Sequence, residues 1–374
     1  MNVFVIPSWY DTGDKPHCGV FFAEQAHALI RVGHKVHLFY PDLRFRLGGL
    51  PTGVFPLPGD VPGLFCRRRS LTPFWERGRW PQRQWMLEKL YRQAEREWGR
   101  PDVVHLHACT MGVEAVWLCR KHRLPLVYTE HYSALMDEPR GVLREQLTRT
   151  LAGATVAVAV SRALQERLRD YRADTYYIPN LVDAERFAPA PAPHEGFVFG
   201  VLGNLIPRKR VDRLLRAFAK AGLENTRLRI GGDGPERERL ERLAVSLRLE
   251  KQVEFCGAVP YAQTPAFYNA CDCLVSASKA ETFGMTLIEA LACGVPVLST
   301  RSGGPESIVV PGQNGWLVPV DDVDALADSL RQAVQHAFDP AALRADCIAR
   351  FGEWTVVRQI EEAYRKAIYG YERI

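Results

Sequence analysis

The stretch CLVSASKAETFGMTLIEALACGVPVLST, residues 273–300, decides the fold of the second half of this chain. An apolar run, CLVSAS, is followed by a polar turn, by a segment with helical periodicity, and by a second apolar run, VPVLST. Strands that are apolar throughout and alternate with helices are typical of a parallel sheet covered on both faces. The stretch therefore predicts a strand–helix–strand unit of an α/β domain.

The same alternation extends through most of the 374 residues. Further strand-like runs are VFVI (3–6), KVHLFY (35–40), DVVHLH (102–107), LPLVYTE (124–130), ATVAVAVS (154–161), FVFGVLG (197–203), RLRIGGDG (227–234) and VEFCG (253–257). Between the two halves, the Pro- and Ala-rich segment 177–196 indicates a stiff linker. We therefore predict two doubly wound, Rossmann-like domains, 1–185 and 196–354, that face a cleft where ligands bind. A helix at about 355–374 can pack back onto the N-terminal domain.

Composition and charge are those of an ordinary globular protein, with 47% hydrophobic and 24% charged residues. No apolar run reaches the length of a membrane span, and the N-terminal one is too short for a signal peptide. The nine scattered cysteines, from Cys18 to Cys347, are expected to be buried thiols in a reducing cytoplasm. Residues 1–180 carry a net charge of +7 and the remainder −2, so the N-terminal half is expected to meet an acidic partner or surface.

Two acidic residues flank the start of the helix in the opening stretch. Glu289 by itself is explained by a capping box, Thr286-x-x-Glu289, and Thr282 could also cap. A capping box does not explain Glu281, which directly follows a strand and would face the cleft. Gly284 at the helix start lets a ligand approach backbone N–H groups that favour anions. A sugar nucleotide, with hydroxyls for two carboxylates and a phosphate for the helix end, fits this arrangement.

The segment resembles glycosyltransferase family 4 of the GT-B fold. Glu281 and Glu289 match the E-x7-E motif of that family, and residues 290–319 are similar to its C-terminal signature. The resemblance implies a retaining, nucleotide-sugar-dependent enzyme. It also implies that Glu281 contacts the donor sugar and that Glu289 contacts the ribose. The backbone expected to lie against the diphosphate is that of Phe283, Gly284, Met285, Thr286 and Leu287.

The loop in GVLGNLIPRKRVDRLLRAF, residues 200–218, is the second part of the expected donor site. A basic helix start is commonly only a solvated surface. By the resemblance, however, Lys209 is the family's diphosphate-binding lysine, and Gly203 gives room beside it. The family's usual arginine is replaced by Asn204, and Arg208 is the expected substitute. Two further loops resemble family loops around the nucleotide, and they contribute Gly232 and Ala258.

In the N-terminal half, the loop after the first strand contributes Gly19, which is expected to offer backbone N–H groups to the donor phosphate. An ordinary turn glycine is the alternative. His131 ends a strand, and a lone histidine is more often structural. By the resemblance it lies beside the reacting sugar, so His131, Lys209 and Glu281 are the expected catalytic residues. His107 is expected on the acceptor side, whereas His105 is expected to pack in the sheet.

Residues 64–100 hold ten Lys and Arg against four acidic residues, with Phe and Trp interleaved. Such a mixture suits peripheral contact with an anionic membrane. A solvated basic face of an acceptor-domain insertion explains it equally well. Nucleic acid is not expected, because no nucleic-acid-binding module is recognisable.

The sequence thus predicts a cytoplasmic glycosyltransferase, expected at the inner face of the cell membrane. It would transfer a hexose-type sugar from a nucleotide-diphosphate donor to a glycan, lipid-linked or small-molecule acceptor, in cell-surface polysaccharide or glycolipid biosynthesis. No cofactor and no metal is expected, because cations and amide dipoles would stabilise the leaving diphosphate. Three alternatives stay open: a glycoside hydrolase that uses two carboxylates, a sugar-nucleotide epimerase, and a non-catalytic sugar-nucleotide binder, which the replacement by Asn204 would favour.

Overall fold

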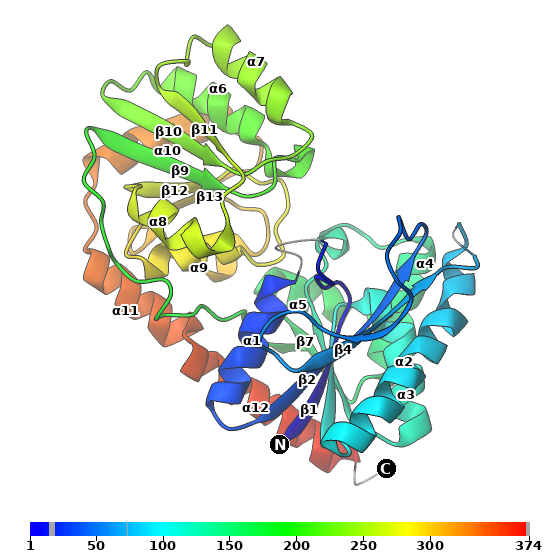
Figure 1. Ribbon diagram of the computed structural model, residues 1–374. Helices are drawn as coiled ribbons and strands as arrows, with labels where there is room; N and C mark the ends of the chain where they lie inside the picture. The colour runs from blue at the N-terminus through cyan, green and yellow to red at the C-terminus, as the bar shows by residue number, and fades with distance from the viewer. Residues whose placement is uncertain (15–18, 73, 372–374) are drawn as a thin grey trace. The chain divides into compact units, whose positions relative to one another are not determined.

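The computed structural model describes residues 1–14, 19–72 and 74–371, and the chain divides into two compact units (Figure 1). Unit 1 comprises Met1–Val160, Leu164–Pro179 and the C-terminal segment from Val356. Unit 2 comprises Ser161–Ala163 and Asn180–Thr355. The division after Pro179 falls six residues before the predicted end of the N-terminal domain at 185.

Unit 1 is built on an eight-stranded sheet with the order β3-β4-β2-β1-β5-β6-β7-β8. Every neighbouring pair is parallel except β3 and β4. The carboxyl ends of the parallel strands therefore share one edge of the sheet. The strands are β1 (Asn2–Pro7), β2 (Lys35–Arg44), β3 (Gly53–Pro56), β4 (Gly63–Arg69), β5 (Val103–His107), β6 (Leu126–Glu130), β7 (Val156–Ala159) and β8 (Tyr176–Tyr177).

Helices cover both faces of this sheet (Figure 1). This agrees with the burial of nearly every residue of β1, β5, β6 and β7, because a strand is buried on both sides only where both faces of the sheet are covered. The C-terminal helix belongs to this unit from Val356 onward, and it buries Tyr364 completely. The helices are α1 (Val20–Arg31), α2 (Glu76–Trp98), α3 (Gly112–His122), α4 (Gly141–Gly153), α5 (Arg162–Arg169) and α12 (Glu353–Tyr371).

Unit 2 contains a six-stranded, wholly parallel sheet with the order β11-β10-β9-β12-β13-β14. Its strands are β9 (Phe197–Leu202), β10 (Thr226–Gly231), β11 (Val253–Gly257), β12 (Cys273–Ser276), β13 (Val297–Thr300) and β14 (Gly315–Val318). Its helices are α6 (Val211–Ala221), α7 (Arg237–Ser246), α8 (Thr264–Asn269), α9 (Met285–Ala292), α10 (Val323–Gln335) and α11 (Pro340–Phe351). One core lies between the sheet and α6, α7 and α10.

The segment 177–196 differs from the predicted linker. Phe187 is fully buried, and the side chain of Asn269 donates to the carbonyl of Ala188 and accepts from the N–H of Ala190. Arg344 donates to the carbonyls of Phe187 and Ala184 at 2.5 and 2.7 Å. Most of the segment is therefore fixed to unit 2, because its backbone groups find partners there.

Candidate functional site

The N-terminus of α9 is the centre of the candidate donor site in unit 2. Its N-cap is Gly284, with a φ of 115°, and no side chain caps the helix. The capping box, which was the alternative explanation of Glu289, does not form at this helix, and Thr282 is not the cap either. Instead, Glu289 faces inward and accepts a hydrogen bond from the buried Tyr268 hydroxyl.

Glu281 lies just before this helix and faces the loop that follows β9. Its carboxylate forms an ion pair with Lys209, and its Oε1 accepts a hydrogen bond of 2.8 Å from Ser278. Arg208 approaches its Oε2 at 3.7 Å while donating to the carbonyl of Ala280 at 2.6 Å. The tertiary structure thus brings together Arg208, Lys209 and Glu281, which the sequence analysis assigned to one site although Lys209 and Glu281 are 72 residues apart in the chain.

Electrostatics keep this carboxyl group ionised. Burial by itself raises the pKa of Glu281, but the charge and hydrogen bond of Lys209, with help from Arg208, outweigh burial and lower it. The side chains of Glu281 and Lys209 are 11% and 24% exposed. The pair is therefore shielded from most solvent but remains accessible from one side.

Two glycine turns lie against each other beside Lys209. A Cβ at Gly203 would lie 3.6 Å from Lys209 Cε, so the lysine side chain passes directly over this glycine. A Cβ at Gly232 would lie 1.9 Å from the carbonyl oxygen of Gly203. Gly232, with a φ of 131°, is therefore required by the packing of the two turns. A small pocket next to them is lined by Gly203, Asn204, Lys209 and Thr286, among others.

The remaining predicted donor residues lie at the same edge of the second sheet. Phe283 and Leu287 are buried, so their backbones rather than their side chains are available to a ligand. Met285 and Thr286 begin α9 and are half-buried. Ala258 directly follows β11 and is exposed.

In unit 1, the candidate residues gather at the carboxyl ends of β5 and β6. His131 follows β6, and its Nε2 lies 3.0 Å from Nδ1 of His107, the last residue of β5. Burial lowers the pKa of His131 to about 3, and it lowers the pKa of His107 well below the ordinary value. The buried Nδ1 of His131 has no hydrogen-bond partner among the described residues. His107, only 1% exposed, supports His131 from beneath.

Glu130 is a residue that sequence reasoning missed. It is fully buried, and its Oε1 accepts from the backbone N–H groups of His131 and Tyr132 at 2.7 and 2.6 Å. Its Oε2 accepts from the hydroxyl of Tyr128 and from the N–H of Cys109. Burial raises the pKa of Glu130 although these hydrogen bonds oppose the shift. The sequence did contain an indication of this role, since Glu130 is a carboxylate that directly precedes His131 at the end of an apolar strand.

His105 packs within the sheet unit, as expected. Its Nδ1 lies 2.8 Å from the hydroxyl of Tyr364 on α12, and its Nε2 lies 2.8 Å from Oγ1 of Thr129. Its ring lies 4.1 Å from that of His107. The C-terminal helix therefore contacts His105 through Tyr364, and His105 in turn packs against His107.

Gly19 is the N-cap of α1, with a φ of 81°. A Cβ there would lie 2.9 Å from the carbonyl oxygen of Trp9, so the position favours glycine on backbone grounds. Cys18 and residues 15–17 lie outside the described residues.

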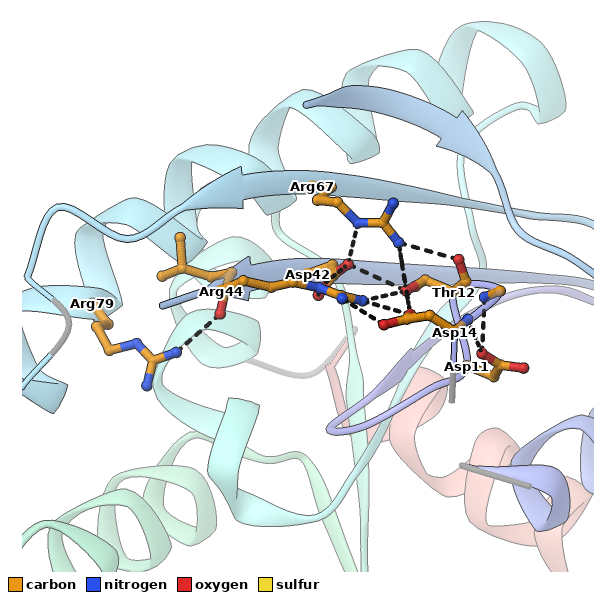
Figure 2. Close-up of polar contacts among 9 residues, drawn as sticks. Asp11, Thr12, Asp14, Asp42, Arg44, Arg67 and Arg79 are labelled. Atoms are coloured by element: carbon orange, nitrogen blue, oxygen red, sulfur yellow. Dashed lines mark hydrogen bonds and ion pairs between the residues drawn. The ribbon is translucent and has the colours of Figure 1, made fainter. Parts of the chain in front are cut away.

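The first part of the same loop is tied to β2 and β4 by a charged network that the sequence did not reveal (Figure 2). Arg67 and Arg44 each donate to Asp42, and both donate to Oγ1 of Thr12 at 2.8 Å. Arg44 also binds Asp14, and this hydrogen bond lowers the pKa of Asp14 to about 2. Asp42 and Arg67 are buried, so the network fixes Thr12 and Asp14, in the described part of the loop after β1.

Comparisons with known proteins agree with this architecture. The family model described as Glycosyltransferase Family 4 matches residues 19–186, and the one described as Glycosyl transferases group 1 matches residues 183–350. A D-inositol 3-phosphate glycosyltransferase of Frankia alni is 29% identical over 400 residues, which cover 96% of this chain and 96% of that relative.

Solved structures give the same fold. The sucrose-phosphate synthase of Thermosynechococcus elongatus matches with a TM-score of 0.79 at 20% identity, over 99% of this chain and 100% of that one. The Anabaena protein HepE in complex with UDP matches with a TM-score of 0.75 at 20% identity, over 97% and 99% of the two chains. With the two family matches together running from residue 19 to residue 350, the chain belongs to the family 4 glycosyltransferases of the GT-B fold.

Proposed function

We propose that this glycosyltransferase is a retaining enzyme that moves a hexose-type sugar from a nucleotide-diphosphate donor to an acceptor hydroxyl. The observation that carries the proposal is the meeting of Lys209, Arg208 and Glu281 at the N-terminus of α9. Cations, a helix N-terminus and a carboxylate complement a diphosphate and a sugar bonded to it.

The chemical demand on the donor site comes from the leaving diphosphate, which gains negative charge as its bond to the sugar lengthens. An ammonium group has three N–H donors, and Glu281 engages one of those of Lys209. The other two are available to phosphate oxygens. The first N–H groups of α9 have no partner within the helix and add a fixed positive potential.

The two carboxylates have separate tasks in this proposal. Glu281, kept ionised by Lys209, accepts hydrogen bonds from hydroxyls of the donor sugar. Glu289, held by Tyr268, binds the ribose of the nucleotide. Asn204 lines the pocket beside Lys209, and Arg208 supplies the second cation in place of the family's usual arginine.

Unit 1 supplies the residues next to the reacting sugar and the acceptor. Gly19 offers its backbone to the donor phosphate, and His131 positions the sugar, supported by His107 and Glu130. The neutral state of His131 suits a positioning role, because its pKa of about 3 keeps it uncharged at neutral pH. The leaving phosphate itself accepts the proton of the acceptor hydroxyl.

The relatives support a nucleotide sugar as donor, since the HepE structure contains UDP. They also support a polar hydroxyl acceptor, since the Frankia relative is named for inositol 3-phosphate. We propose a glycan, lipid-linked or small-molecule acceptor used in cell-surface polysaccharide or glycolipid synthesis. The eight described cysteines are free thiols, and a cytoplasmic location would keep them so. None of the helices in the described part of the chain combines the length and apolar character needed to cross a bilayer.

The test begins with the melting temperature of the protein in the presence of UDP, GDP or ADP. One of them should raise it, because a ligand that binds only the folded state stabilises that state by mass action. The matching sugar nucleotides are then offered with a panel of acceptors, and NMR identifies the anomeric configuration of the product. Inversion of configuration would refute the retaining mechanism. Release of free sugar at the same rate without any acceptor would refute transferase activity.

A further inference from the structure

Exposed aromatic and aliphatic side chains gather at one end of unit 1. Of the ten large hydrophobic residues that are exposed in the described chain, five lie within positions 45–85. Phe74 and Leu71 are 90% and 85% exposed. The five are Phe45, Leu71, Phe74, Trp75 and Trp85. Such an exposed apolar group marks a surface that meets an apolar partner.

These side chains come from three neighbouring segments, the end of β2, the turn after β4 and the first half of α2. Phe45 directly follows β2, and Phe74 lies in the turn that follows β4. Their ring centroids are 5.0 Å apart. Gln82 accepts from the N–H of Leu71 and therefore joins this turn to α2. Leu71 and Trp85 also line a pocket of about 330 Å³, together with Leu43, Arg68, Arg69, Pro81, Gln82 and Met86.

Cations border the apolar side chains without carboxylate partners. Arg68 lies 4.6 Å above the ring of Trp85, Lys89 lies 5.7 Å from the same ring, and Arg46 lies 5.5 Å from that of Phe45. Together with Arg69, they form no ion pair with any residue that the structure describes. We name these four cations and the five hydrophobic residues the aromatic–basic patch.

Several basic residues of this segment that lie outside the patch do have carboxylate partners. Arg77 pairs with Glu145, Arg83 with Glu114, and Arg92 with Glu88. Part of the positive charge of residues 64–100 is therefore neutralised by carboxylates. Arg96 and Arg100 form no ion pair in the described part of the chain either, and the unpaired cations of this range that border the exposed rings or the pocket are Arg68, Arg69 and Lys89. Pro73, within that range, lies outside the described residues.

We infer that the aromatic–basic patch docks on the surface of a bilayer containing anionic phospholipids. Tryptophan and phenylalanine rings lie favourably at the boundary between headgroups and acyl chains, and arginine and lysine at that depth attract lipid phosphates. The pocket is lined by two arginines, Arg68 and Arg69, and otherwise mostly by apolar side chains, a combination that matches a phosphodiester headgroup and the start of its acyl chains.

Charge complementarity and the exposed rings together favour a membrane over a free phosphate compound. Inorganic phosphate would satisfy Arg68 and Arg69, but it would leave Phe74 and Leu71 in water. A bilayer satisfies both groups at once. The inference needs no particular donor or acceptor and so does not depend on the proposed function.

Docking would also place the bilayer near the sugar-transfer residues of unit 1. The patch lies at the carboxyl ends of β2 and β4, and His131 lies at the carboxyl end of β6, on the same edge of the sheet. Four strand spacings separate β4 from β6, about 19 Å. A lipid-linked acceptor would therefore be held within reach of the site, a consequence that rests on the proposed function.

The test is flotation of the full-length protein with vesicles of phosphatidylcholine alone or with added phosphatidylglycerol. Binding should require the anionic lipid and should weaken as salt is added. Arg68→Glu/Arg69→Glu should weaken it by roughly 30-fold or more, since each arginine near an anionic surface contributes roughly five-fold. Phe74→Ser/Trp75→Ser should weaken binding by roughly tenfold per ring.

Matched controls lie in unit 2. Arg216→Glu/Arg242→Glu makes the same change in charge, and Trp354→Ser removes an exposed tryptophan elsewhere (69% exposed). Both should bind vesicles like the unmodified protein, and melting temperatures should show that every variant is folded. Equal losses in patch and control variants would overturn the inference, as would no flotation with anionic vesicles. Complete displacement from vesicles by inorganic phosphate at constant ionic strength would instead identify a soluble-phosphate site.

Discussion

Replacing Glu281 by glutamine should affect the enzyme's interaction with the donor sugar and its binding of the diphosphate in opposite directions. Glu281 is ion-paired with Lys209 and approached by Arg208. The substitution keeps the shape and an oxygen for Ser278 but removes the negative charge. The carboxylate that accepts hydrogen bonds from the sugar hydroxyls then loses its negative charge. Lys209, no longer ion-paired, can direct all three of its N–H donors at phosphate oxygens.

The structure sets the magnitudes. Loss of an ion pair that is buried on one side and partly solvated on the other should cost about 1–2 kcal/mol of unfolding free energy, below the cost of a fully buried pair. Loss of a preorganised contact to the reacting sugar should lower kcat by about 10²- to 10³-fold. Affinity for the nucleoside diphosphate without sugar should be unchanged or increase by up to about tenfold, because the competing carboxylate is gone.

Two further variants complete the experiment. Lys209→Met should weaken binding of the nucleoside diphosphate by about 10- to 100-fold. Glu250→Gln, an exposed carboxylate of unit 2, serves as the control and should change neither quantity. Affinity is measured by calorimetry and turnover by product formation. If Glu281→Gln weakens diphosphate binding as much as Lys209→Met does, Glu281 organises the phosphate site and not the sugar, and near-normal turnover would refute its role altogether.

Three other outcomes follow from the geometry. The buried histidine cluster of unit 1 keeps pKa values far below 6.5, so the unfolded chain binds more protons than the folded one from about pH 6.5 down to about pH 3. As the pH is lowered below about 6.5, the unfolding free energy, measured with denaturant, should therefore fall by about 1 kcal/mol or more per pH unit until the protein unfolds, whereas a flat profile would contradict the burial of these histidines. Glu130→Gln should lower stability by about 2–3 kcal/mol, since its amide nitrogen cannot accept two of the four hydrogen bonds, and should reduce kcat through a displaced His131. Gly232→Ala should cost about 2–3 kcal/mol through its contact with Gly203, whereas Gly222→Ala, with open space around it, should cost less.

Local sequence patterns were enough to predict many of the strands. The apolar runs before residues 107, 130, 202 and 276 each became a strand in the interior of a sheet, because only buried parallel strands need apolar residues on both faces. For residues 64–100 the sequence indicated only a basic and aromatic composition, and there the structure contains most of β4 and the 23-residue helix α2. The polar surface of α2 conceals its periodicity, since its charges are satisfied by pairs such as Arg83 and Glu114.

The capping box shows where local spacing misleads. Thr286 and Glu289 have the right separation, but α9 begins at Met285 with Gly284 as its N-cap, and the hydroxyl of Tyr268, 21 residues before Glu289, donates to the carboxylate. A buried hydroxyl and carboxylate gain more from each other than a solvated cap would, because the low-dielectric interior strengthens the bond.

The sequence by itself determined the α/β alternation, the family and the pair Glu281 and Lys209, since these depend on short-range periodicity and on residue types at fixed spacings. Only the tertiary structure decided that Glu281 neutralises Lys209, that Glu130 holds the backbone at His131, and that Asp42 ties the first loop to β2 and β4. Those contacts join residues on different turns and strands. Their strength comes from burial and hydrogen-bond geometry, which arise only once the sheets have formed.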